Sequence, residues 1–339
     1  MPNAELDFSR PPTDRERVRL EARLRRVGTP EFRRLVDGVY PNLRSLGPGH
    51  GDLVSRGLVM RPGFVFRSSD TLRDSSDRSA PPREERPPAT RVGNSRGAAL
   101  RTYLLALAIA QAHRKKGSKA RLNDFGIEIL GASGSLGWPD IVATPAVQGA
   151  SARVYLSARD KRARAVRAAL VTLQKAGLVL VPQAQGARGR YSNLVLLNES
   201  GVESTGEPEE YTVPKPDTRV VVLPSGFITN GWVHVLEDSE IALLLMVASH
   251  EGGWLEGGYA VVPAAVRLLN YGIHRDPYST ARKTLEWFGL IDVEEVGRHD
   301  DGRAEDDERM VHRIRLRVDQ FERPGLDLMQ EALSSQISR

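Results

Sequence analysis

The sequence feature that most constrains the fold is an internal repeat. Residues 172–181 (TLQKAGLVLV) match residues 284–293 (TLEWFGLIDV) at a constant offset of 112 positions. In each copy an amphipathic helix ends at a glycine, Gly177 or Gly289, and the chain continues directly as a strand rich in β-branched residues. Glycine is the usual residue where a helix ends in the left-handed conformation, so the repeat predicts two similar helix-to-strand junctions.

Each repeated strand is followed by a polar, glycine-containing tip and by a second strand with alternating apolar residues. The tips span 183–190 and 297–309, and the second strands span 191–197 and 310–318. A helix followed by a strand, a flexible tip and a second strand is the order of the recognition helix and wing in a winged-helix domain. The repeat therefore predicts two winged-helix domains in tandem.

The second copy is complete upstream of this unit. Residues 238–248 predict an apolar helix with an acidic first turn, and residues 259–262 predict a short strand. Pro263 begins a helix that closes at Gly272, because proline is favoured at the first helical position. A short turn then leads to a helix over 277–289. Two short helices joined by a tight turn form a helix-turn-helix arrangement.

The first copy is less compact. Residues 97–116 predict an amphipathic helix, residues 122–130 a second helix, and residues 157–176 the recognition-type helix. About 25 residues rich in Gly, Ala, Ser and Pro separate the second helix from the third. We expect this insertion to alter the geometry of the first domain.

Two changes in composition divide the chain. The stretch 67–96 is rich in Ser, Asp, Arg and Pro, and its few apolar side chains cannot offset the entropy of ordering the chain. The stretch 199–217 is rich in Glu, Pro and Gly. We therefore expect an α+β protein with these parts: a helical and irregular N-terminal segment (1–66), a flexible linker (67–96), a basic winged-helix domain (97–198), a second linker (199–217), an acidic winged-helix domain (218–325) and a C-terminal tail (326–339). The helix expected over 13–37 is open to three roles: a coiled dimerisation arm, a second DNA grip or a docking peptide.

The charge of the chain is distributed unevenly. Residues 101–200 hold 15 Lys and Arg against 5 Asp and Glu, whereas residues 201–339 hold 14 against 25. A domain-sized segment with a charge of +10 attracts polyanions, because neutralising phosphates releases their counterions. The chain has no cysteine, so disulfides and thiolate chemistry are excluded, and with no long apolar stretch we expect a cytoplasmic, nucleoid-associated protein without membrane partners.

The tandem arrangement resembles plasmid replication initiators that carry two winged-helix domains. The runs at 223–246 (LPSGFITNGWVHVLEDSEIALLLM) and 263–293 (PAAVRLLNYGIHRDPYSTARKTLEWFGLIDV) are similar to proteins of actinobacterial mobile elements and their winged-helix regulators. The resemblance covers roughly residues 97–325 and implies binding to double-stranded DNA. In such initiators the C-terminal domain often makes the principal contacts to DNA repeats, whereas here that domain is acidic.

The helix expected over 157–176 is the best candidate for an element that reads the DNA groove. Helical periodicity places Val166, Leu170 and Leu173 on one face, and much of the basic set points elsewhere. Arginine contacts guanine through two parallel hydrogen bonds or grips phosphate. A solvated basic surface helix is the alternative interpretation. The candidate DNA-binding residues of this helix are Arg159, Lys161, Arg162, Arg164 and Arg167.

Two further basic groups lie in the first domain. Arg188 and Arg190, at the expected wing tip, fit a contact to the minor groove or the backbone, although arginines at turn tips also serve solubility. Arg114, Lys115 and Lys116, after the first helix, fit phosphate contacts or a cationic helix end.

In the second domain, polar and basic residues occupy the recognition-type helix and its start. Tyr, Ser, Arg and Lys side chains at this spacing suit phosphate and base contacts. The acidic tip around 300–308 would repel DNA, so this domain is equally open to dimerisation or partner binding. The candidate DNA-binding residues here are Arg275, Tyr278, Ser279, Arg282 and Lys283.

The sequence has no recognisable catalytic motif, and we expect a protein that is not an enzyme and needs no cofactor or metal. It contains neither a phosphate-binding GxxxxGK[ST] loop nor a dinucleotide-binding GxGxxG after a strand. Its seven histidines form no H-x-H or HExxH pattern, and the acidic run 300–308 lacks the spacing of a calcium loop.

Three functions are consistent with these features. The first is a replication initiator of a plasmid or integrative element that binds repeated origin sites and recruits host replication proteins through its acidic C-terminal part. The second is a transcriptional regulator of a mobile element that binds a palindromic operator as a dimer. The third is an adaptor whose winged helices bind proteins.

Overall fold

The structure is a computed structural model that describes residues 8–46, 56–68, 81–93, 98–120, 127–129, 136–145, 157–181, 191, 194–201, 208–250, 255–296 and 311–339. Helices and small antiparallel sheets make a mixed α+β protein, as expected. None of the helices in these ranges is long and apolar enough to cross a membrane.

The elements of the N-terminal part are α1 (Asp14–Val27), α2 (Pro30–Ser45), β1 (Leu58–Met60), η1 (Pro62–Phe64), η3 (Arg83–Glu85), α4 (Pro88–Val92), α5 (Ala99–His113), α6 (Trp138–Val142), α7 (Ala158–Lys175), β2 (Val179–Leu180) and β3 (Val195–Leu196). Those of the C-terminal part are β4 (Val221–Leu223), α8 (Gly226–Thr229), α9 (Trp232–Val235), α10 (Asp238–Ala248), η6 (Glu256–Gly258), β5 (Ala260–Val261), α11 (Ala264–Leu269), α12 (Arg275–Trp287), β6 (Ile291–Val296), β7 (Val311–Leu316), η7 (Val318–Glu322) and α13 (Gly325–Ile337).

The segment from α10 to β7, which we call the second unit, has the element order expected from the sequence. Its three strands form a sheet in the order β5-β7-β6. The central strand β7 places Ile314 opposite Ala260 on one side and opposite Val293 on the other. α12 packs against both α10 and β6, so the helix that precedes the hairpin is held from two sides.

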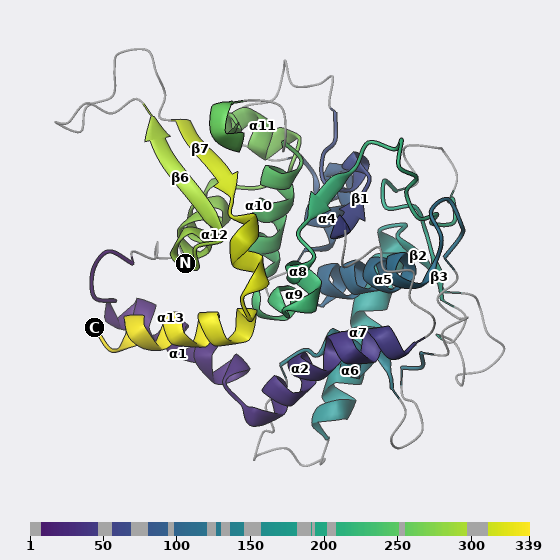
Figure 1. The fold of residues 1–339 in the computed structure, drawn as a ribbon, viewed down its shortest axis with the longest axis horizontal. Helices are drawn as coiled ribbons and strands as arrows, with labels where there is room; N and C mark the ends of the chain where they lie inside the picture. Colours follow the sequence, from purple (N-terminus) through teal and green to yellow (C-terminus); the bar gives the residue numbers. More distant parts are fainter. Residues whose placement is uncertain are drawn as a thin grey trace.

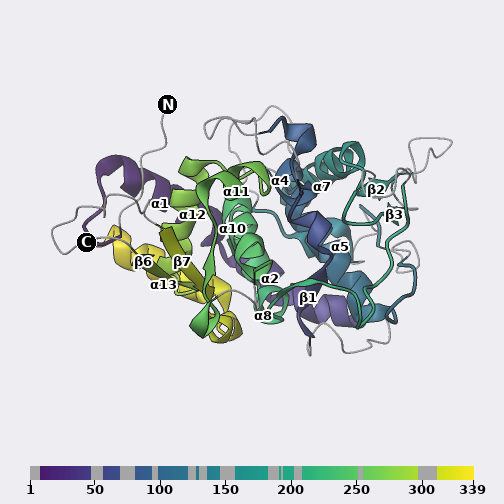
Figure 2. The same ribbon diagram turned by 90° about the horizontal axis from the view of Figure 1, so that it is seen from above.

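The segment from α5 to β3, which we call the first unit, repeats part of this arrangement. α5 packs against α6 and α7, and β2 pairs with β3 so that Val179 lies opposite Leu196. The first unit lies on the right and the second on the left in both views of the molecule (Figures 1 and 2).

The second helix expected in the first unit, over 122–130, is not found in the part of that stretch that the structure describes. Of the stretch 122–130, the structure describes residues 127–129, which are not helical; Glu128 forms a β-bridge with Gly137. Ile127 and Ile129 are buried on either side of the exposed Glu128, which is an alternation typical of extended chain. A short helix, α6, lies inside the expected insertion, where Asp140 accepts a hydrogen bond from the Gly137 amide at 3.0 Å.

The two repeated helix-to-strand junctions form the same backbone hydrogen bonds, all between 2.9 and 3.1 Å. The amides of Ala176, Gly177 and Leu178 donate to the carbonyls of Thr172, Gln174 and Leu173, and those of Phe288, Gly289 and Leu290 donate to Thr284, Glu286 and Leu285. Gly177 and Gly289 have φ angles of 69° and 73°, the left-handed conformation predicted from the sequence.

The N-terminal helices pack against both units and against the C-terminal helix. The stretch expected as one helix, 13–37, forms α1 and α2, because Gly28 ends the first and Thr29 caps the second. α1 lies beside α13 (Figure 1), which occupies most of the expected C-terminal tail. One hydrophobic core runs from Leu20 in α1 to Leu333 in α13.

Part of the segment expected as a flexible linker, residues 81–93, is packed between the two units. Ala89 and Val92 of α4 are buried. The Thr90 hydroxyl donates to the Tyr271 carbonyl of the second unit at 2.8 Å, and the Arg91 guanidinium donates to Ala176 at the end of α7 at 3.0 Å. Composition did not predict this packing because most of these contacts involve the backbone and arginine side chains.

A short antiparallel strand pair also joins the two halves of the chain. β1 precedes the first unit and β4 precedes the second, and their central residues Val59 and Val222 lie opposite each other. The side chain of Gln111, at the end of α5, donates to the Val59 carbonyl and accepts from its amide, at 2.7 and 3.0 Å. The described parts of the two expected domains therefore share a core, and the N-terminal segment shares a sheet with the second domain.

Candidate nucleic-acid interface

α7 is capped by Ser157, the first residue of the helix expected over 157–176. The Ser157 side chain accepts from the Asp160 amide at 3.1 Å, and its hydroxyl donates to the Asp160 carboxylate at 2.7 Å. The hydroxyl's hydrogen bond lowers the pKa of Asp160. Such a reciprocal cap stabilises a helix start, so the first turn of α7 is well defined.

The apolar face of α7 is buried as predicted, but two of its five candidate cations lie on buried or half-buried faces. Arg162 is 6% exposed, and its guanidinium contacts the Glu31 carboxylate of α2 at 2.9 Å. Arg159 contacts the Asp140 carboxylate of α6 at 3.0 Å. These ion pairs attach α7 to its neighbours, and Arg162 is removed from the set of side chains that can reach DNA.

The other cations of α7 lie on its outer face. Arg164 and Arg167 are exposed, and Lys161 is half-buried. Val171 continues the same row and is 40% exposed. Positions three and four apart share a helix face, so this row presents two guanidinium groups and one apolar side chain.

The basic group after α5 is placed at the surface. Lys115 and Lys116 are exposed and Arg114 is half-buried. The chain then turns at Gly117, whose φ angle is 79°, and Lys119 pairs with Glu210 at 3.1 Å. The lysines of this group are accessible to a polyanion.

Two of the candidate residues in α12 are structural. Tyr278 is buried, and the Arg267 guanidinium lies 4.3 Å from the centre of its ring. Burial raises the pKa of the Tyr278 hydroxyl. Arg282 is 9% exposed and lies 3.5 Å from the Glu286 carboxylate. Tyr278 and Arg282 therefore support the helix from its inner side.

The outer side of α12 carries basic, acidic and hydroxyl side chains. Arg275 is exposed at the first turn, and Ser279 and Lys283 are half-buried further along. Burial, followed by the positive charge of Arg86, lowers the pKa of His274 at the helix N-cap. Arg86 comes from the expected linker and was not predicted as a site residue. The charge of Arg86 acts on His274 because residues 81–93 fold against this turn. The sequence carries no signal for that packing.

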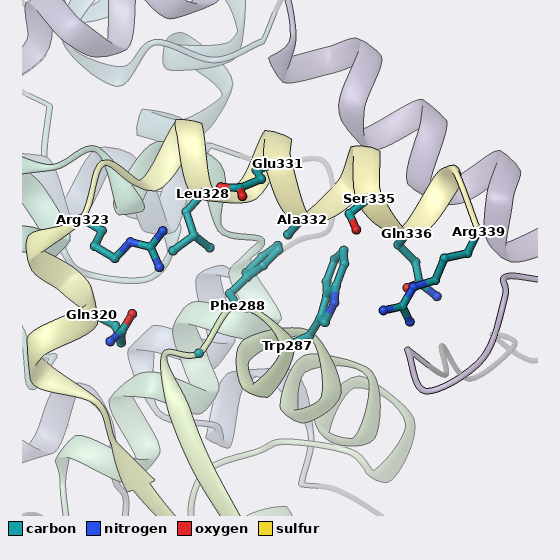
Figure 3. A pocket seen from close by; sticks show the side chains of 11 residues that line it. Trp287, Phe288, Gln320, Arg323, Leu328, Glu331, Ala332, Ser335, Gln336 and Arg339 are labelled. Atoms are coloured by element: carbon teal, nitrogen blue, oxygen red, sulfur yellow. The ribbon is translucent and has the colours of Figure 1, made fainter.

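A separate cavity of about 350 Å³ lies between the C-terminal end of α12 and α13. Trp287, Arg323 and Arg339 are among the side chains that line it (Figure 3). The ring of Phe8 stacks on Trp287 with centroids 4.1 Å apart. Trp287 and Arg275 are at opposite ends of α12, so this cavity is separate from the basic side chain at the start of the helix.

Arg188 and Arg190 of the expected first wing lie outside the described residues, as does the acidic tip around 300–308. Within the described ranges no group of three or more acidic or histidine side chains could hold a metal ion. Comparisons of the chain with known protein families, with characterised proteins and with solved structures give no match.

Proposed function

We propose that this chain is a sequence-specific double-stranded-DNA-binding protein that uses two winged-helix modules, the first and second units. The observation that carries the proposal is the repeated junction: α7 and α12 end in identical hydrogen bonds and lead into paired strands. A helix held in this way before a hairpin is the element that winged-helix proteins place in the major groove.

The outer row of α7 supports DNA as the ligand. Arg164 and Arg167 are exposed in a segment with a strong excess of basic residues. Guanidinium groups suit guanine edges and phosphates, and Val171 suits a thymine methyl group. The first unit then makes the principal contacts, because Asp276 and Glu286 on the outer side of α12 are exposed and acidic.

For the biological role we propose replication initiation at repeated origin sites of a plasmid or integrative element. This rests on the resemblance of the tandem arrangement to plasmid initiators. A transcriptional regulator would use the same DNA-binding surface and differs in the arrangement of its sites.

The proposal is tested by selecting bound duplexes from fragmented host and plasmid DNA at about 0.15 M salt, where non-specific binding is weak. We expect enrichment of a defined sequence. Several directly repeated copies of that sequence beside an AT-rich stretch support initiation, whereas a single site at a promoter supports regulation. Recovery of bulk DNA without enrichment contradicts sequence-specific binding and leaves the protein adaptor as the function to pursue.

A further inference from the structure

A second internal repeat lies upstream of each unit. Residues 59–65 (VMRPGFV) match residues 222–228 (VLPSGFI) at an offset of 163 positions. The backbone repeats with the sequence. The amides of Phe64, Val65 and Phe66 donate to the carbonyls of Arg61, Pro62 and Pro62, and those of Phe227, Ile228 and Thr229 donate to Pro224, Ser225 and Ser225. Each unit is therefore preceded by the same strand and turn.

The register of the strand pair is symmetric with respect to this repeat. Val59 lies opposite Val222, its own equivalent at the offset of 163. Leu58 lies opposite Leu223 and Met60 opposite Val221, and exchanging the two copies turns one of these pairs into the other. An antiparallel pair with this property has a local two-fold axis through its centre. The burial of the strands is symmetric as well. The four residues that flank the central pair, Leu58, Met60, Val221 and Leu223, are all at most 2% exposed.

Each strand is attached to its own unit in the same way. β1 packs against α5, and β4 packs against α10. A Cβ atom on Gly63 would lie 2.6 Å from the side chain of Ser200, just past β3, and one on Gly226 would lie 2.0 Å from the carbonyl of Phe321, just past β7. In both units the glycine of the turn is therefore pressed against the chain that leaves the final strand.

The contacts across the axis are also reciprocal. α4, which precedes α5, packs against α10 of the other unit. α9, which precedes α10, receives a hydrogen bond from the other unit, because Arg101 of α5 donates to the Val233 carbonyl at 2.8 Å. In Figure 2, β1 lies between α5 and α10.

From these observations we infer that the two units are related by an approximate two-fold axis, so that one chain presents α7 and α12 to DNA as a symmetric dimer would. The inference rests on the proposed DNA binding and adds the geometry of the target: two half-sites in inverted orientation, bound by a single chain. A head-to-tail relation of the units would instead require two half-sites in direct orientation.

The two half-sites have different sequences. At the offset of 112, the outward positions of α7 are Arg164, Arg167, Val171 and Gln174, and their equivalents in α12 are Asp276, Ser279, Lys283 and Glu286. The first set suits guanine and thymine, whereas the second contains one cation and two carboxylates. The two half-sites are therefore inverted in orientation, but together they do not form a palindromic base sequence.

The test uses the absence of cysteine in the chain. Gln174→Cys and Glu286→Cys place a single thiol at equivalent exposed positions near the ends of α7 and α12, away from the arginines proposed to contact DNA. Each variant is labelled with an iron chelate that cleaves nearby DNA. Cuts on the enriched duplex are mapped on both strands, and the mass of the complex gives the number of chains. The unsubstituted chain, treated with the same reagent, is the control and should give no cuts.

We expect one chain per site, and a cutting pattern for Glu286→Cys that equals that of Gln174→Cys after the two strands are exchanged about a central point. Patterns related by translation along the same strand would overturn the two-fold relation, and so would cuts from the Gln174→Cys variant alone. Two chains per site would overturn binding by a single chain. Failure of both variants and of the unsubstituted chain to bind any duplex would instead overturn the proposed function.

Discussion

At the scale of single residues, the cations of α7 divide into a structural and an exposed set. Arg162 is almost fully buried and paired with Glu31, whereas Arg164, two positions later, is exposed. Truncating a buried arginine removes the packing of its side chain, while surface changes have little effect. The two arginines are therefore expected to respond differently to the same substitution.

We predict that Arg162→Ala lowers the free energy of unfolding by about 1–3 kcal/mol, whereas Arg164→Ala changes it by less than about 0.5 kcal/mol. Chemical denaturation followed by circular dichroism measures both. Equal effects of the two substitutions would show that Arg162 is not held as the structure has it.

The stability of the protein is expected to depend on pH through His234. This side chain is buried in α9, and burial, followed by the positive charge of Arg101, lowers its pKa from 6.5 to about 3. Between these values the unfolded chain binds a proton that the folded chain excludes, so stability is complete above pH 6.5 and falls as the pH drops toward 3.

Thermal melting at pH 7 and pH 5 tests this. The loss of stability on acidification should be smaller in His234→Leu than in the unsubstituted chain, by up to about 1.4 kcal/mol per pH unit within the window. An identical acid response of the two proteins would exclude His234 as its source.

Periodicity predicted the apolar face of α7 but not the burial of Arg162. The sequence shows one stripe, Val166, Leu170 and Leu173, whereas in the folded helix Arg162 is also buried and pairs with α2. The partner, Glu31, is 131 positions away, and nothing in the local pattern indicates it.

At the scale of elements, the two junction glycines allow both helices to end in the left-handed conformation. An alanine at a φ angle near 70° is strained, so Gly177→Ala and Gly289→Ala should each lower the free energy of unfolding by about 1–2 kcal/mol. Gly38 in the interior of α2 is the control, because a Cβ atom there meets only the Asn42 side chain at 3.5 Å. Gly38→Ala should raise stability by about 0.5–1 kcal/mol.

Denaturation of the three variants gives the comparison. A neutral effect of alanine at both junctions would contradict the left-handed helix ends in the two units.

Elements with strong local signals were predicted well, and those that depend on distant partners were not. The helix expected over 238–248 coincides with α10, and that expected over 157–176 contains α7. α6 was missed because five residues carry little periodicity, although Pro139 and Asp140 are helix-start signals. α13 was missed because its apolar face packs against two elements that are distant in the sequence, α1 and α9.

At the scale of the whole molecule, the N-terminal helix ties the second unit to the rest of the core. The Arg23 guanidinium of α1 forms two hydrogen bonds of 2.7 Å to the Glu240 carboxylate of α10, and both side chains are buried. Removing one partner of such a pair leaves an uncompensated buried charge, whereas replacing both with apolar residues of similar volume is often tolerated.

Arg23→Met is therefore expected to lower the free energy of unfolding by about 3–5 kcal/mol, and Arg23→Met with Glu240→Met to recover most of the loss. Denaturation curves and limited proteolysis of the two variants measure this. A double variant as unstable as the single one would mean that the side-chain shapes, and not the charges, hold α1 in place.

The tandem repeat of helix, strand, tip and strand could be predicted from the sequence. The strand pair β1-β4, which joins the two halves of the chain, could not. β1 and β4 are three residues each and are separated by 163 positions, so their pairing has no local signature. The shorter repeat around the two Gly-Phe pairs, Gly63-Phe64 and Gly226-Phe227, was the available signal, but it becomes interpretable only when the strands are seen opposite each other.

The central claim, that the outer face of α7 binds DNA, is tested most directly by the affinity of Arg164→Ala/Arg167→Ala for the enriched duplex as a function of salt. The control, Arg25→Ala/Arg323→Ala, removes two exposed arginines from other elements. We predict at least a tenfold loss of affinity for the α7 variant and a salt slope smaller by about 2, since each lost phosphate contact reduces it by about 1. The control should bind like the unsubstituted chain. Equal affinity and slope for the α7 variant and the control would contradict the account.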